Sequence, residues 1–131
     1  MSALTQDRLT PEREGKLLVL PMAASTTVFA GSLVAVNGDG YAVPGSTATG
    51  LTAAGRAEEA KTNGATAGAE IVRVRRGTFK FANLEADPVA KLLTTCYIVD
   101  DQTVAATNGT NTRSAAGKVL AIDADGVWVE I

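Results

Sequence analysis

Four aspartates lie in pairs that could hold a hard metal cation: Asp100 with Asp101, and Asp123 with Asp125. Clustered carboxylate oxygens are the ligands that Ca²⁺ prefers. Each pair, however, falls in a short turn between apolar runs, where Asp is favoured because its side chain accepts a backbone N–H. The chain also lacks an Asp-x-Asp-x-Asp-Gly loop followed by a distant Glu. We therefore interpret these aspartates as turn formers and expect neither a metal ion nor another cofactor.

The residues that usually carry catalysis are scarce. The chain contains no histidine, which removes the commonest general base, the commonest metal ligand and the Ser-His pair. Glu58 and Glu59 could act as paired carboxylates, but adjacent residues of a strand point to opposite faces. Cys96 is the only cysteine, and its apolar strand pattern is typical of a small buried side chain. These features predict that the protein is not an enzyme.

The stretch Arg73–Phe81, which contains the run RRGTFKF, concentrates positive charge and alternates it with two phenylalanines. Its cations are Arg73, Arg75, Arg76 and Lys80. The run loosely resembles an RNA-recognition strand, in which aromatic rings stack on bases. Nucleic-acid-binding domains usually carry a positive excess, whereas this chain has a formal net charge of −2. We therefore disfavour a nucleic-acid partner and expect the cations to pair with the chain's own glutamates or with a partner's.

The elements that would position these residues are hairpins. Leu33–Val43 (LVAVNGDGYAV) and Val119–Val129 (VLAIDADGVWV) each join two apolar runs through a turn ending in Asp-Gly, and Tyr97–Ala105 follows the same plan. Glu70–Ala82 is the strongest strand pattern, and Gly77 marks a bend where it passes from one sheet to another. Lys16–Leu20 and Ser25–Phe29 are further candidate strands.

Two segments are less regular. Leu51–Ala60 fits a helix or a strand, and we favour a strand with a bulge at Gly55. Asp87–Leu93 predicts one very short helix, with Asp87 as N-cap and Pro88 as its first residue. The fold class is therefore all-β, a small β-sandwich or β-barrel built of hairpins with one very short helix.

The chain of 131 residues has the length of one domain. Residues 1–15 (MSALTQDRLTPEREG) are polar and aperiodic, which predicts a flexible N-terminal arm, and 16–131 form a single β domain. The arm has no apolar core typical of a signal peptide, and no apolar run is long enough to span a bilayer. We expect a soluble protein made in the cytoplasm, with no membrane partner.

The order of these elements resembles the small capsid decoration, or cement, proteins of tailed bacteriophages. The resemblance spans roughly residues 15–131 and rests on FAGSLV (29–34) entering GYAVP (40–44), on Val72–Asn83, on Tyr97–Ala105 and on Asp125–Ile131. It implies a β-rich virion protein on the outer surface of the assembled head, clamping neighbouring subunits of the major capsid protein. It also implies a homo-oligomer, with a trimer favoured and a dimer second, and no catalytic residues.

Two hypotheses about contacts follow. The arm would order on the shell or on a neighbouring protomer, by burying Leu4, Leu9 or their neighbours, or by adding a strand to an exposed edge. The strand Arg73–Phe81 would form an interface through its charged and aromatic side chains. The rivals are another virion β-module, such as a tail-tube or head–tail connector protein, and an oligonucleotide-binding barrel. The candidate capsid or protomer contacts are Leu4, Leu9, Arg73, Arg75, Arg76 and Lys80.

Overall fold

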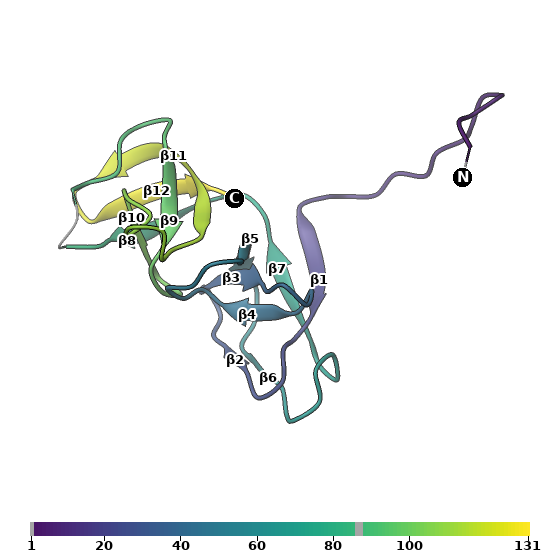
Figure 1. Ribbon diagram of the computed structural model, residues 1–131, viewed down its shortest axis with the longest axis horizontal. Coiled ribbons are helices and arrows are strands. Elements are labelled where there is room, and N and C mark those ends of the chain that lie inside the picture. The colour runs from purple at the N-terminus through teal and green to yellow at the C-terminus, as the bar shows by residue number, and fades with distance from the viewer. Residues whose placement is uncertain (1, 86–87) are drawn as a thin grey trace.

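The computed structural model describes residues 2–85 and 88–131. These residues form an all-β fold without a helix, in which a five-stranded sheet lies against a small closed barrel (Figure 1). The strands are β1 (Leu17–Pro21), β2 (Thr27–Val28), β3 (Leu33–Val36), β4 (Ala42–Pro44), β5 (Thr52–Ala57), β6 (Lys61–Thr62), β7 (Ile71–Arg75), β8 (Thr78–Asn83), β9 (Thr95–Ile98), β10 (Thr103–Ala105), β11 (Ala115–Asp123) and β12 (Gly126–Glu130). The prediction of a small β-sandwich or barrel is confirmed.

The first sheet has the strand order β1-β7-β5-β3-β4, with every neighbouring pair antiparallel. Strand β7 shows why the sheet forms: Val72 and Val74 are fully buried, whereas Ile71 before them and Arg73 between them are exposed. This period of two places one face of the strand in a core and the other in solvent. Strands β2 and β6 make a separate two-stranded sheet, so the predicted strand Ser25–Phe29 is shortened to Thr27–Val28.

The barrel runs β10-β8-β12-β11-β9 and closes through a parallel pairing of β10 with β8. Its core includes Phe81, Cys96 and Ile98. Strand β3 joins the two parts, because Leu33 packs in the barrel core while its neighbour Val34 packs in the core of the first sheet. Successive residues of β3, which point to opposite faces of the strand, therefore pack in the two cores and hold the sheet and the barrel together.

Two glycine predictions are confirmed. Strand β7 belongs to the first sheet and β8 to the barrel, so the chain changes sheet at Gly77. Residues 52–57 are a strand, and its pairing with β3 shifts register between Val34 and Ala35, which marks a bulge beside Gly55. Gly55 has a φ of 147°, and a Cβ there would overlap the carbonyl oxygen of Arg75. Only glycine fits this close approach of two strands.

The predicted hairpins form as β3–β4, β9–β10 and β11–β12, but the predicted short helix is wrong. Asp87 lies outside the described residues, and Pro88–Leu93 is irregular. Its hydrogen bonds go to the barrel: the Ala90 N–H donates to Asn83 Oδ1 at 3.2 Å and the Leu93 N–H to the Val119 carbonyl at 2.7 Å. Ala90 itself is buried in the barrel core, so tertiary packing overrides local helix signals.

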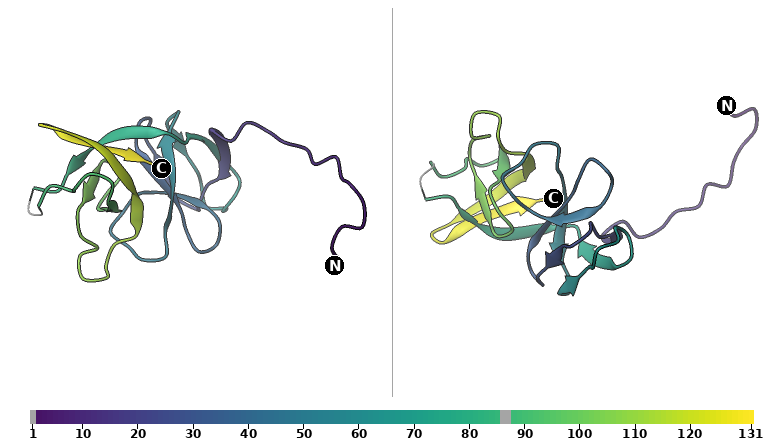
Figure 2. Two further views of the ribbon diagram at one scale, coloured as in Figure 1. Left: turned by 90° about the horizontal axis from the view of Figure 1, so that it is seen from above. Right: turned by 60° about the horizontal axis from the view of Figure 1, so that its bottom comes forward.

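The N-terminal arm has no regular structure, and its described residues are exposed as far as Lys16. Figure 2 shows the arm leading away from the sheet, on the side opposite the barrel. Among the described residues, none belongs to a helix of the length and apolarity that crossing a membrane requires.

Candidate functional site

The arm presents the two predicted leucines to solvent. Leu4 is 71% exposed and Leu9 97% exposed. The arm joins the body at Lys16, whose N–H donates to Glu14 Oε1 at 2.8 Å and whose carbonyl accepts the Arg76 N–H at 2.7 Å. Within the described residues, the segment before Glu14 therefore leaves Leu4 and Leu9 uncovered.

Arg73 and Arg75 lie on β7 and pair with acids of the same chain. Glu58 Oε1 accepts from Arg56 at 2.8 Å and lies 3.3 Å from Arg75 Nε, and Glu59 pairs with Arg73 at 3.3 Å. The hydrogen bond from Arg56, with the charge of Arg75 beside it, lowers the pKa of Glu58 below its usual value. The prediction that these arginines pair with the chain's own glutamates is confirmed, and their charge is largely neutralised.

Lys80 lies on β8, in the barrel, and its ammonium group contacts Asp125 at 3.1 Å and Asp123 at 3.9 Å. It also lies 5.8 Å from the centre of the Trp128 ring, whose Nε1–H donates to Asp123 at 2.9 Å. The hydrogen bond from Lys80 lowers the pKa of Asp125. These aspartates therefore stabilise the β11–β12 turn, in agreement with their interpretation as turn formers.

Arg76 stands apart, because within residues 2–85 and 88–131 its side chain belongs to no ion pair. It lines a hollow of about 510 Å³ at the root of the arm, together with Lys16 and Glu130. The structure thus distributes the predicted contacts over separate places: the arm, the outer face of β7, the arm root and the barrel. They do not converge on one site.

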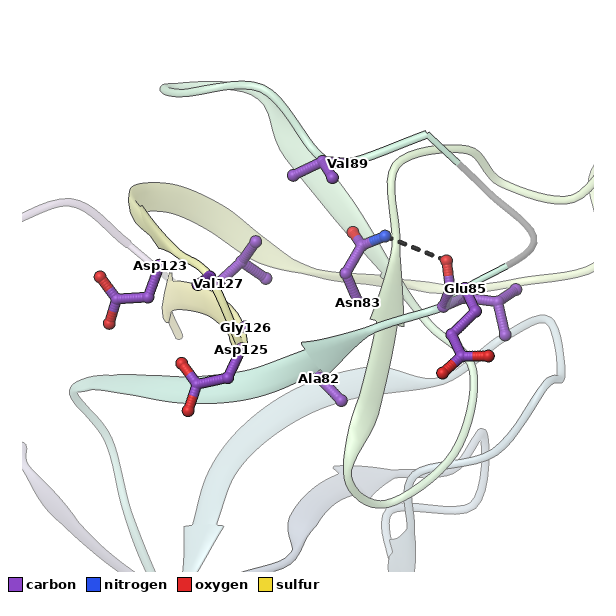
Figure 3. Close-up of a pocket in the computed structure, with 10 residues that line it drawn as sticks. Ala82, Asn83, Glu85, Val89, Asp123, Asp125, Gly126 and Val127 are labelled. Atoms are coloured by element: carbon purple, nitrogen blue, oxygen red, sulfur yellow. Dashed lines mark hydrogen bonds between the residues drawn. The ribbon is translucent and has the colours of Figure 1, made fainter.

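The β11–β12 turn borders a hollow of about 360 Å³, lined by Asn83, Glu85, Val89, Asp123 and Asp125 among others (Figure 3). The carboxylates of Asp123 and Asp125 point away from Glu85 in this view. No group of three or more metal-ligating side chains occurs in the described part of the chain. The hollow therefore lacks a convergent set of polar groups, which small-molecule sites require.

Two aromatic rings of the RRGTFKF run have different surroundings. Phe81 is buried in the barrel core. Phe79 is partly exposed, and the guanidinium of Arg56 lies 4.5 Å from the centre of its ring, a cation–π contact. The sequence gives no local signal for this contact, because Arg56 comes from β5 and Phe79 from β8.

One end of the barrel carries an exposed apolar surface that none of the predicted contact residues belongs to. We call it the barrel-end patch, and it comprises Val89, Leu92, Leu93, Leu120 and Ile122. The first three belong to the segment that was predicted to be a helix, and the last two to β11. The Leu92-Leu93 pair is the available signal, but it falls within the segment predicted to be a helix, which the structure does not form.

Comparison of the chain with protein-family models, with curated proteins and with solved structures finds no match. The resemblance to capsid decoration proteins therefore stays a prediction.

Proposed function

We propose that this chain is a structural virion protein that binds the outer surface of an assembled phage head and stabilises it by bridging subunits of the major capsid protein. The observation that carries the proposal is the exposed arm, with Leu4 and Leu9 projecting from a rigid β body. The ordered resemblance of residues 15–131 supports the same function. The virion surface would be its location, after synthesis in the host cytoplasm.

The arm must make backbone hydrogen bonds as well as apolar contacts. Ordering residues 4–9 costs roughly 1–2 kcal/mol per residue in backbone entropy. Burying two leucines returns roughly 1.5–3 kcal/mol each, which is less than that cost. Addition of the arm as a strand to an exposed sheet edge would supply the missing hydrogen bonds. Several weak arms on one oligomer would then hold the shell tightly, because the second contact is effectively intramolecular.

Binding to empty heads tests the proposal. Heads assembled from the major capsid protein alone are mixed with the purified chain, pelleted and viewed by electron microscopy. We expect the wild-type chain to pellet with the heads, and Leu4→Ser with Leu9→Ser to weaken binding by about a hundredfold or more, since the lost burial is worth roughly 3 kcal/mol or more. The matched control is Thr5→Ser with Thr10→Ser, at equally exposed arm positions.

Two outcomes of this experiment contradict the proposal. One is that wild-type protein leaves the heads bare. The other is that the isolated chain assembles into rings or tubes, as a tail-tube or connector protein would.

An oligonucleotide-binding barrel is the weaker alternative. Stacking on bases needs exposed rings, whereas Phe81 is buried and Arg56 covers one face of Phe79. Binding to single-stranded DNA at low salt, where phosphate contacts are strongest, would favour the barrel function. We expect no measurable binding there.

A further inference from the structure

The barrel-end patch is continuous across two segments of the chain. The Leu93 N–H donates to the Val119 carbonyl at 2.7 Å, and the Val119 N–H donates to Thr94, so the loop runs beside β11. At its other end, Val89 lines the same hollow as Asp123 (Figure 3). Leu92 and Leu93 are 57% and 69% exposed, and Leu120 and Ile122 about 40%. Several large apolar side chains so close together indicate an interaction surface rather than scattered exposure.

Charge is distributed unequally along this patch. Lys118 lies on β11 at the Leu93 end, opposite Thr95, and Lys91 is nearby in the loop. Asp123 and Asp125 lie at the opposite end, in the β11–β12 turn, where Lys80 pairs with both of them and one negative charge remains in excess. Neither lysine takes part in an ion pair within the described residues. The patch is therefore apolar in the middle, positive at one end and negative at the other.

Such a surface is complementary to a second copy of itself. If two copies meet across a two-fold axis near Leu120, β11 runs antiparallel to its counterpart. Lys118 of each copy then faces Asp123 of the other, because the bulge between Val119 and Ala121 puts these two residues, five positions and roughly 16 Å apart, on the same face of β11. Leu120 of the two copies meets in between, with Leu92 and Leu93 of the adjoining loop beside it, whereas Ile122 lies on the other face of β11, opposite buried Val127. We propose that the barrel-end patch is a two-fold interface through which two copies of this chain dimerise.

The pairing has the features of an isologous interface, in which one patch packs against its own copy. An apolar centre with a charged rim is the usual anatomy of such interfaces, and the rim charges set the register more than the affinity. The chain's own arm is not the occupant within one copy, because it leaves the body on the side away from the barrel (Figure 1). The inference does not depend on head binding.

Sedimentation velocity from 1 to 100 µM tests the interface in the full chain. We expect a dimer, which Leu92→Ser with Leu93→Asn converts to a monomer. Asn is chosen because Leu93 has a φ of 62°, a conformation that Asn tolerates better than most residues. The control is Val19→Ser, at an exposed apolar position on β1. Unchanged circular dichroism and melting temperature show that each variant is folded.

A charge-swap experiment tests the register. Lys118→Glu alone places like charges at both ends of the interface, as does Asp123→Lys alone, so each variant should dimerise about tenfold or more weakly. An equimolar mixture of the two restores opposite charges at both ends, and we expect it to form heterodimers with near wild-type affinity. A wild-type monomer at 100 µM, a trimer, a patch variant that still dimerises, or a mixture without rescue would each overturn the proposal.

Discussion

Replacement of Asn63 by Asp is the sharpest test of how the structure holds its first sheet. Asn63 is 2% exposed, and its Nδ2 donates to the carbonyls of Met22, Ala23 and Thr66 at 3.0–3.1 Å. Asn63→Asp replaces this donor with a carboxylate oxygen facing three carbonyl oxygens. Asn63 Oδ1, which becomes the second carboxylate oxygen of the variant, already has no hydrogen-bond partner among the described residues. The variant therefore buries a charge with nothing to compensate it.

The expected loss is large. The loss of these contacts, in which two N–H groups are shared among three carbonyls at roughly 0.5–1.5 kcal/mol per hydrogen bond, and an uncompensated buried charge together predict a loss of about 3–5 kcal/mol at pH 7. Burial and the carbonyls raise the pKa of the new carboxyl group above its unfolded value. The folded state then binds the proton more tightly, so the loss grows as pH rises from the unfolded pKa to the folded one. Protonation at pH 4 restores one donor, and the deficit should shrink.

Urea unfolding at pH 7 and pH 4 measures both effects, with Asn37→Asp as the matched control. Asn37 also precedes a glycine, but its Oδ1 accepts from the N–H groups of Asp39 and Tyr41, both at 3.0 Å. A carboxylate accepts equally well, so this control should change stability by no more than about 0.5 kcal/mol. If the unfolding free energy of Asn63→Asp lies within about 1 kcal/mol of the wild-type value at pH 7, or if the deficit is the same at both pH values, the buried amide of Asn63 does not stabilise the fold in this way.

Three further predictions concern single sites. Gly55→Ala forces a Cβ into a carbonyl of β7 at a φ of 147° and should cost about 2–4 kcal/mol in unfolding free energy, whereas Gly64→Ala, with open space around it, should cost less than about 1 kcal/mol. The hydrogen bond from Arg56 lowers the pKa of Glu58, so this ion pair stabilises the folded state above the pKa that Glu58 has in the unfolded chain, and the stabilisation is lost as the pH falls through the pKa of the folded state. Urea unfolding should therefore show that Glu58→Gln loses less stability than wild type between pH 7 and pH 3. Burial raises the pKa of the Cys96 thiol to about 11, so iodoacetamide at pH 8 should alkylate the native chain at least roughly 200-fold more slowly than the unfolded chain, followed by mass spectrometry.

Local patterns predicted those parts of the fold that local chemistry decides. The alternation Val72-Arg73-Val74 defines a half-buried strand, and the Asp-Gly turns define hairpins, because each depends on a few neighbouring residues. The helix at 88–93 failed because Ala90 is held in the barrel core by Asn83, a contact outside the segment. The pairing of β10 with β8 that closes the barrel is parallel and joins residues about twenty positions apart, so no turn motif in the sequence predicts it.

The candidate site was harder to predict than the fold. Arg73 and Lys80 are seven positions apart in one basic stretch of the sequence. The change of sheet at Gly77 gives them different acidic partners. Whether a cation is free to bind another molecule depends on such partners, which come from distant segments. The periodicity of the sequence predicts the strands and which side chains are exposed, but it does not predict the ion pairs that neutralise the exposed cations.

The placement of the arm and the barrel-end patch bears on how the two proposals combine. The arm leaves the sheet on the side opposite the barrel (Figure 2), so copies joined through the patch would carry their arms on the two outer sides of the pair. An arm of residues 2–14 spans at most about 43–47 Å when extended. Two arms that start from opposite sides therefore reach separated points on a shell, and one bound arm raises the effective concentration of the other. Dimerisation through the patch would thus convert a weak single contact into a bridge between capsid subunits, without any cation of β7 or β8 leaving its own acidic partner.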